Sequence, residues 1–240
     1  MHIMRRGPLA SAARLHREAN HMSDKPGISI WTSAVWTALY LVAIVAYALL
    51  SEAICRSIAP AYRPYVDMAL SIACQAAFIV LLMRRRQFRF DPLKNVTRRG
   101  VLWALLGAPA LLVIGTLLDP LLTRLMPYSQ QVYSESVDVL KVTPLVSLIT
   151  VCIAAPVFEE TMFRRFMLDG LTRRYGKLPA LLVSSVLFAL LHLNPYQIAS
   201  VFLTGVGLGT VYLLTQSLGC CMLMHSAYNL LVFVLSLAIN

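Results

Sequence analysis

The sequence is poor in charged residues. Asp, Glu, Lys and Arg make up 13% of its 240 residues, about half the share of an ordinary soluble domain. Hydrophobic residues make up 58% and occur in long uninterrupted runs. Because a soluble domain of this length covers one core with a charged surface, these runs indicate that lipid is the solvent.

Zinc-binding patterns and paired cysteines are also absent from the sequence. The five cysteines have no zinc-ribbon spacing, and there is no His-Glu-x-x-His segment. We therefore expect reduced thiols that pack as small apolar groups. The cysteines are Cys55, Cys74, Cys152, Cys220 and Cys221.

Seven apolar runs approach the length of about 20 residues that a membrane-crossing helix needs. Irregular backbone cannot face lipid, so we expect an all-α polytopic transmembrane helix bundle of about seven spans. A polar segment, Ser129–Lys141, is expected to form an interfacial helix before the fourth span. The expected spans are Ile30–Leu50, Tyr65–Met83, Val101–Leu118, a run from Pro144 to Phe158, Leu178–His192, Ile198–Thr215 and Gly219–Ile239.

The net charge of +10 would suit nucleic acid, but the distribution of the charge favours membrane topology instead. Of the 21 basic residues, 17 fall before the first span, between residues 84 and 99, or between residues 164 and 177. These segments alternate along the chain and share one side of the bilayer. Since Lys and Arg concentrate in cytoplasmic loops, we expect a cytoplasmic N-terminus, lipid as a partner and no nucleic acid.

Two adjacent carboxylates follow the apolar part of the fourth span. On a helix, Glu160 and Arg164 lie on one face in the order that favours an ion pair, while Glu159 points about 100° away. The guanidinium can then hold one carboxylate while the other stays free. Headgroup water at a helix end would account for the same three charges without a site.

Two histidines are the only groups that titrate near neutral pH in the last 63 residues, which contain no Asp, Glu, Lys or Arg. Phe188 shares a helical face with His192, and Asn229 shares one with His225. A convergent imidazole and amide could stabilise an oxyanion. The simpler interpretations are core packing for Phe188 and hydrogen bonds inside the bundle for the polar side chains.

The three motifs follow one another in order: Glu-Glu-x-x-x-Arg at 159–164, Phe-x-x-x-His at 188–192 and His-x-x-x-Asn at 225–229. In this order they resemble the CPBP family of membrane proteases, which includes the CAAX prenyl proteases of the Rce1 type and the bacterial Abi proteins. The similarity runs from about Pro144 to Leu231. Each motif alone is weak, whereas three in order on successive spans are specific.

The resemblance divides the chain into a cytoplasmic tail (1–29), N-terminal transmembrane helices and loops (30–143) and a catalytic transmembrane core (144–240). The tail could equally be a transit-like segment, or lie partly upstream of a true start at Met22. The implied protein is an intramembrane endopeptidase of the bacterial inner (plasma) membrane. Its substrate is expected to be a peptide or a membrane protein.

The resemblance also implies roles for the motif residues. Glu159 would be the general base that activates water, and His192 would position or polarise that water. His225 and Asn229 would form the oxyanion site, around a hydrated cavity open to the cytoplasmic side. Supporting roles would fall to Glu160, Arg164 and Phe188.

A glutamate-and-histidine mechanism needs no metal, and we favour it. The alternative is zinc held by Glu159, His192 and His225, since two histidines, one glutamate and an open position make a catalytic zinc set. Eukaryotic CAAX proteases often carry an Asn one turn after the middle histidine. Here that position is Tyr196, after Asn194 and Pro195, which counts against a prenylated CAAX substrate.

Two other functions stay open at this stage. A non-catalytic immunity or scaffold protein could retain the same fold, and a small transporter could use the buried groups for protons, although no inverted repeat supports it. The depth of the residues also raises a difficulty. Glu159 lies toward the inner end of the fourth span and His192 near the outer end of the fifth. They meet only if the fourth helix continues past Arg164 or the span ends differ from those expected.

Overall fold

The structure is a computed structural model, and it describes residues 26–238. Within that range all regular elements are helices and none is a strand, which confirms the all-α prediction. The first 25 residues of the predicted tail lie outside the described range. The elements are α2 (Ile30–Cys55), η1 (Pro60–Tyr62), α3 (Arg63–Arg86), α4 (Arg98–Leu125), α5 (Pro127–Val142), α6 (Pro144–Ile149), η2 (Thr150–Ala154), α7 (Ala155–Glu160), η3 (Thr161–Leu168), α8 (Asp169–Tyr175), α9 (Lys177–Leu190), α10 (Pro195–Thr215) and α11 (Leu218–Ala238).

Six helical stretches in the described part are long and apolar enough to cross a membrane, and α9 is a seventh, shorter apolar helix. This agrees with the expected number of spans. The predicted end of the fifth span at His192 is wrong, because α9 ends at Leu190 and His192 lies in the turn that follows. The physical reason is Pro195, which begins α10 and disfavours a helical residue before it. Asn194 is accordingly extended and caps α10.

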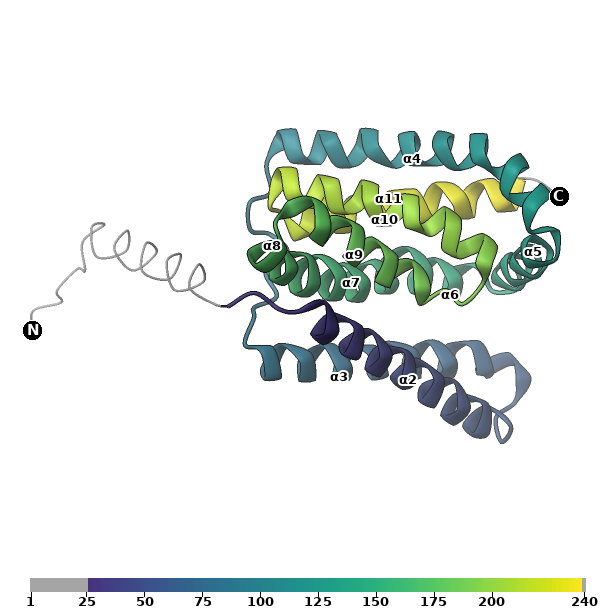
Figure 1. The fold of residues 1–240 in the computed structure, drawn as a ribbon. Coiled ribbons are helices and arrows are strands. Elements are labelled where there is room, and N and C mark those ends of the chain that lie inside the picture. Colours follow the sequence, from purple (N-terminus) through teal and green to yellow (C-terminus); the bar gives the residue numbers. More distant parts are fainter. Residues whose placement is uncertain (1–25, 239–240) are drawn as a thin grey trace, which may run out of the picture.

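The helices form one bundle with a hairpin beside it (Figure 1). Helix α4 packs along α10 and α11, and α9 packs on α10. The hairpin of α2 and α3 meets the bundle through aromatic side chains near one of its ends: the Trp36 ring lies 6.3 Å from that of Phe166, and Tyr40 and Phe78 are buried in the shared core. Most of the hairpin surface is therefore left to lipid.

The fourth span is one continuous helical stretch of 32 residues, Pro144–Tyr175. It contains two π-helical segments, η2 and η3, on either side of α7. Pro156 explains the first, since a proline within a helix has no N–H to donate and crowds the preceding turn. The stretch continues past Arg164, which removes the difficulty over depth: the carboxylates lie well inside a long helix.

Helix α10 approaches its neighbours closely through glycine. A Cβ on Gly205 would lie 3.2 Å from atoms of Ser185 and Phe188 on α9. Small residues allow membrane helices this close contact. The glycine therefore fixes how near Phe188 comes to α10.

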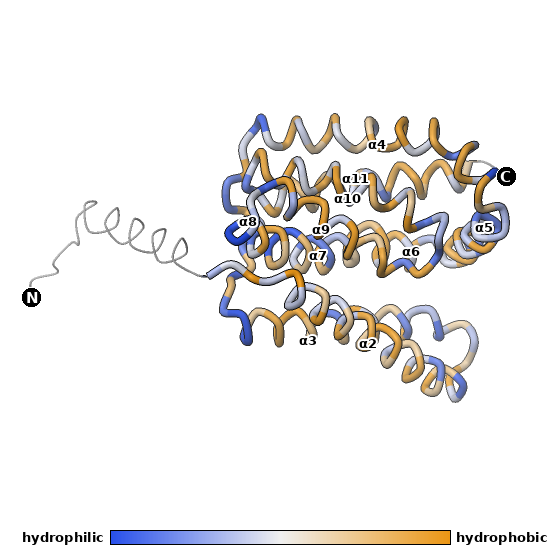
Figure 2. The backbone as a smooth tube through the Cα atoms, viewed as in Figure 1, coloured by the Kyte–Doolittle hydropathy of each residue, from blue (hydrophilic) through white to orange (hydrophobic). Residues whose placement is uncertain are grey.

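Residue hydropathy changes along the bundle axis: the middles of the helices are mostly apolar, and hydrophilic segments gather toward the two ends (Figure 2). The end of α3, the start of α4 and the turn between α8 and α9 lie together at one end, as the alternation of the basic segments predicts. At the other end, the polar segment expected to be helical is present as α5. Its position at a membrane surface stays a prediction.

Candidate active site

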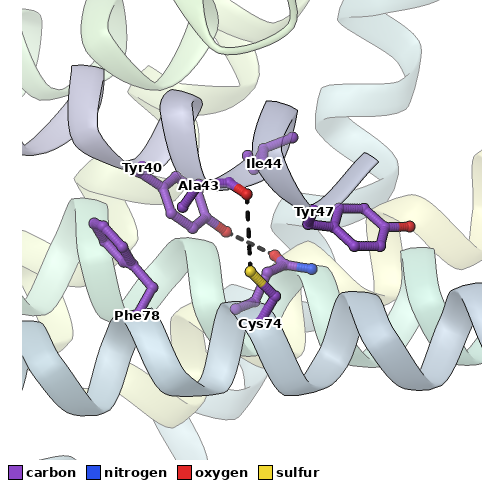
Figure 3. Close-up of a pocket in the computed structure, with 7 residues that line it drawn as sticks. Tyr40, Ala43, Ile44, Tyr47, Cys74 and Phe78 are labelled. Atoms are coloured by element: carbon purple, nitrogen blue, oxygen red, sulfur yellow. Dashed lines mark hydrogen bonds between the residues drawn. The ribbon is translucent and has the colours of Figure 1, made fainter. Parts of the chain in front are cut away.

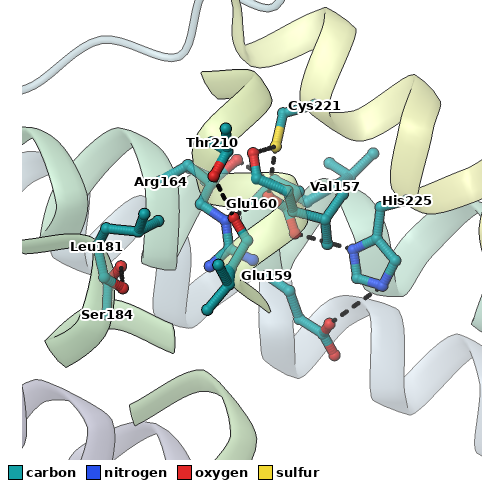
Figure 4. A network of polar contacts seen from close by, with 12 residues as sticks. Val157, Glu159, Glu160, Arg164, Leu181, Ser184, Thr210, Cys221 and His225 are labelled. Atoms are coloured by element: carbon teal, nitrogen blue, oxygen red, sulfur yellow. Dashed lines mark hydrogen bonds and ion pairs between the residues drawn. The ribbon is translucent and has the colours of Figure 1, made fainter. Parts of the chain in front are cut away.

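Glu160 is fully buried, and both of its carboxylate oxygens have partners (Figure 4). Its Oε1 lies 2.9 Å from Nδ1 of His225. Its Oε2 lies 3.0 Å from Nε of Arg164 and accepts a hydrogen bond of 2.9 Å from the Cys221 thiol. Three partners from two helical segments, η3 and α11, therefore converge on this one carboxylate.

Arg164 is also fully buried, and its charge is met from two sides. Its Nε forms the ion pair with Glu160, and its guanidinium carbon lies 4.8 Å from the centre of the Phe188 ring. Within the described residues, its two Nη atoms have no hydrogen-bond partner. A cation over an aromatic face is stabilised most where water is excluded. The Phe188 ring therefore offsets part of the free-energy cost of burying Nη atoms that have no hydrogen bond.

Glu159 has a different environment although it is the next residue in the chain. Its side chain is 20% exposed and, among residues 26–238, forms no hydrogen bond. Its Oε2 lies 3.8 Å from Nε2 of His225, and it interacts electrostatically with His192 and with Tyr40 of α2. The expected contrast between a tied and a free carboxylate is therefore present, with Glu159 the free one.

Both imidazoles pack against Phe188. The ring centres of His192 and His225 are 5.6 Å and 5.9 Å from that of Phe188, and both imidazoles stand nearly perpendicular to the phenyl ring. Phe188 is buried in the core, as the packing interpretation expected. Nδ1 of His192 is buried without a hydrogen-bond partner in the described range, so this ring nitrogen is not used to hold the fold together.

Asn229 is held by the backbone of the fourth span. Its Nδ2 donates a 2.8 Å hydrogen bond to the carbonyl of Val151. In the π-helical segment η2, which contains Val151, the N–H of Ala155 donates to the carbonyl of Thr150, five residues earlier. In the same pattern the carbonyl of Val151 would accept a hydrogen bond from the N–H of residue 156. Pro156 has no N–H to donate. Asn229 thus satisfies a carbonyl that the proline leaves open, and its other amide hydrogen is available for a further acceptor.

The sequence analysis missed two residues that the structure brings to this site. Cys221 precedes His225 by four residues, which places both on one face of α11, and this spacing was the available signal. Tyr40 had no such signal, because it belongs to the first span. It is buried, and its hydroxyl donates a 2.6 Å hydrogen bond to Gln75 of α3.

The residues that depart from the family pattern have structural partners. Asn194 caps α10 through Gln197 N–H and donates to the carbonyl of Ser129. The hydroxyl of Tyr196 donates to the carboxylate of Asp119 in α4. These contacts tie the start of α10 to α4 and α5, beyond the turn that carries His192.

A pocket lies between the two hairpin helices. Figure 3 shows it between α2 and α3, and none of the motif residues lines it. Tyr40 lines this pocket and also interacts electrostatically with Glu159. Tyr40 is therefore the residue that the pocket shares with the surroundings of Glu159.

The metal-ligand set considered from the sequence lacks the necessary arrangement. In the described part of the chain, no group of three or more His, Cys, Asp or Glu side chains is placed to hold a metal ion. All five cysteines are free thiols, as expected. Whether the protein uses a metal stays a prediction.

Comparison with known proteins supports the resemblance seen in the motifs. Residues 141–231 match a family model described as "Type II CAAX prenyl endopeptidase Rce1-like". This segment contains all three motifs and the helices that carry them. No curated protein matches the chain, and no solved structure does.

The match and the helical architecture together define an integral membrane protein whose C-terminal part is similar to membrane proteases of the CAAX type. The more particular relationship is to the Rce1-like type II enzymes named by the family model. The similarity is confirmed for residues 141–231, and it does not extend to α2, α3 and α4.

Proposed function

We propose that this protein is an intramembrane endopeptidase in which Glu159 is the general base. The observation that supports this most is the contrast between two adjacent carboxylates. Glu160 is buried with three partners, whereas Glu159 is partly exposed, has no hydrogen bond within the described residues and faces an imidazole. Neighbouring acids in opposite environments are typical of sites where one acts chemically and the other is fixed.

The proposed mechanism needs a hydrogen-bond donor on each ring nitrogen of His225. Glu160 is an acceptor toward Arg164 and Cys221, so Nδ1 of His225 is the donor in its bond to Oε1. A donor role toward an oxyanion would require a second proton, on Nε2, because both ring nitrogens donate only in the imidazolium. That second N–H is then free to donate toward a developing oxyanion.

Peptide hydrolysis in this arrangement needs one water molecule and one proton relay. Glu159 takes a proton from the water as its oxygen attacks the scissile carbonyl carbon, while His192 orients the water. The carbonyl oxygen becomes an oxyanion that receives hydrogen bonds from Nε2–H of His225 and the free amide hydrogen of Asn229. When the C–N bond breaks, Glu159 returns the proton to the leaving amine.

Zinc catalysis is the alternative that we do not favour. Glu159, His192 and His225 would be its ligands, whereas a glutamate-and-histidine mechanism needs no metal. We therefore derive no step through a metal. Activity that resists a strong chelator would support the metal-free mechanism, and activity restored by zinc after chelation would refute it.

The proposed substrate is a peptide or a membrane-associated protein. The Rce1-like match makes a CAAX peptide the first to try, in prenylated and unprenylated form, because Tyr196 counts against the prenylated one. We propose further that the protein resides in the bacterial inner membrane with a cytoplasmic N-terminus, that the bilayer is its partner and that nucleic acid is not.

The deciding experiment substitutes single carboxylates in the reconstituted full-length protein. Glu159→Gln is expected to lower peptidase activity by roughly 10²- to 10⁴-fold, the usual value of a general base, without loss of folded protein. Glu52→Gln removes an exposed carboxylate from α2 and serves as the matched control. Normal cleavage by the Glu159 variant would exclude the mechanism. A cellular phenotype that survives both Glu159→Ala and His192→Ala would instead identify an immunity or scaffold protein.

A further inference from the structure

One end of the bundle carries a dense set of exposed basic side chains. They belong to the last turn of α3, the loop from residue 87 to 97, the start of α4 and the junction of α8 with α9. We call this set the basic end. Its members are Arg84, Arg85, Arg86, Arg89, Lys94, Arg98, Arg99, Arg173, Arg174 and Lys177, all of them exposed.

The basic end has few counter-charges within the described residues. No salt bridge joins any of its ten members to an acidic side chain from 26 to 238. The opposite end is different, because Arg56 pairs with Glu52 at 3.2 Å and Lys141 pairs with Asp138 at 2.9 Å. Among residues 26–238, the basic end thus meets aromatic rings, at Arg86 and Arg174, but no carboxylate.

Three members of the basic end lie at helix N-termini, where the helix dipole disfavours a positive charge. Arg98 and Arg99 open α4, and Lys177 opens α9, with no acidic residue in either first turn. A helix N-terminus carries partial positive charge and is stabilised by anions, so cations there are unfavourable. Helix stability therefore does not explain these residues, whereas an anionic partner does.

Exposed apolar side chains alternate with the basic ones in the same loop. Leu93 is 83% exposed, and Phe90 and Val96 are 41% and 43% exposed. At the other junction Leu178 is 66% exposed. Apolar groups interleaved with Lys and Arg characterise segments that lie among lipid headgroups, where the charges meet phosphates and the apolar groups reach the acyl boundary.

The loop backbone is fixed although its side chains are exposed. Asn95 donates a 3.0 Å hydrogen bond to the carbonyl of Gln216 in the α10–α11 turn. Arg165 donates from Nε to the carbonyl of Arg89 at 3.3 Å. A Cβ on Gly219 would lie only 2.2 Å from the carbonyl oxygen of Pro92, so glycine is needed where the loop crosses α11. The bundle therefore presents the basic and apolar side chains on a preformed surface.

We propose that the basic end binds the headgroups of anionic phospholipids. The lipid phosphates meet the exposed guanidinium and ammonium groups, and Phe90, Leu93 and Val96 enter the acyl boundary. An acidic peptide would satisfy the charges but leave these apolar side chains in water, so the lipid is the better match. This inference does not depend on the peptidase activity.

The test uses the full-length protein in nanodiscs of phosphatidylcholine, with and without phosphatidylglycerol. Native mass spectrometry measures how much phosphatidylglycerol stays bound after extraction. The variant Lys94→Gln/Arg98→Gln/Arg99→Gln removes three charges. A basic residue near the headgroups contributes about fivefold in affinity, so retention should fall on the order of 100-fold. High salt should weaken retention by the wild type.

The matched control is Arg56→Gln/Arg124→Gln, which removes basic side chains from the opposite end, and it is expected to retain the lipid like the wild type. A second variant, Leu93→Gln, keeps every charge and should lose part of the retention without changing its salt dependence. Equal retention by the triple variant and the wild type would overturn the proposal, as would equal losses in the triple variant and the control. Tighter binding of a polyglutamate peptide than of phosphatidylglycerol would identify an acidic polypeptide as the partner instead.

Discussion

The hydrogen bond from Asn229 to Val151 allows a structural role to be separated from a catalytic one. Asn229→Ala removes the donor that satisfies the Val151 carbonyl, which the missing N–H of Pro156 leaves open. Pro156→Ala supplies that N–H within the fourth span. The two substitutions are therefore expected to be coupled, because each changes the donors available to the same oxygen.

The expected size of the coupling follows from hydrogen bonds in membranes. Side-chain hydrogen bonds between membrane helices contribute about 0.6 kcal/mol on average and at most about 1.7. A buried polar group left without a partner costs about 1–3 kcal/mol. Since Val151 and Asn229 are both only partly buried, Asn229→Ala should lower the free energy of unfolding by about 1 kcal/mol. In the Pro156→Ala background this loss should nearly disappear.

Unfolding in mixed micelles, followed by ellipticity as denaturing detergent is added, measures all four proteins of the cycle. Ser226→Ala, on the same helix and without a hydrogen bond in the described residues, is the control. If Asn229→Ala costs the same in both backgrounds, the explanation from Pro156 is wrong. Peptidase assays add a second readout: an oxyanion role for Asn229 predicts that the loss in kcat persists in the double variant even where stability is restored.

Three further substitutions test the packing of the site. Gly205→Val places methyl groups where a Cβ already lies 3.2 Å from Phe188, and thermal unfolding should show a loss of about 1–3 kcal/mol. Asn194→Ala removes the cap of α10, at about 1 kcal/mol, whereas Asn194→Ser should retain most of the stability. Arg164→Gln leaves Glu160 as a buried charge without its cation, which costs about 3–5 kcal/mol; folded yield should collapse, and an unchanged yield would contradict the assigned ion pair.

The membrane helices and the motif cluster could be predicted because their signals are local. Apolar runs fixed the number of spans, and the four-residue spacing from Glu160 to Arg164 predicted the ion pair that the structure contains. The different environments of Glu159 and Glu160 also followed from helix geometry. These inferences needed only neighbours along one helix.

Contacts between distant helices were beyond the reach of the sequence. Nothing near Tyr40 indicates that the first span borders the motif carboxylates, and nothing near Val151 indicates that its carbonyl needs a donor from α11. The end of α9 was misplaced by two residues because hydropathy continues through Leu191, while the chain must already turn for Pro195. Such features depend on backbone geometry and packing, which hydropathy does not record.

The shortness of α9 has a consequence for the surrounding bilayer. Fourteen helical residues extend over about 21 Å, against a hydrocarbon thickness of about 30 Å. Acyl chains beside this helix must compress or admit water to match it. The deformation lies where His192 leaves the helix, so the thickness of the host membrane becomes a variable that acts directly on the motif turn. Lipids with shorter chains should relieve the mismatch there before they affect any other span.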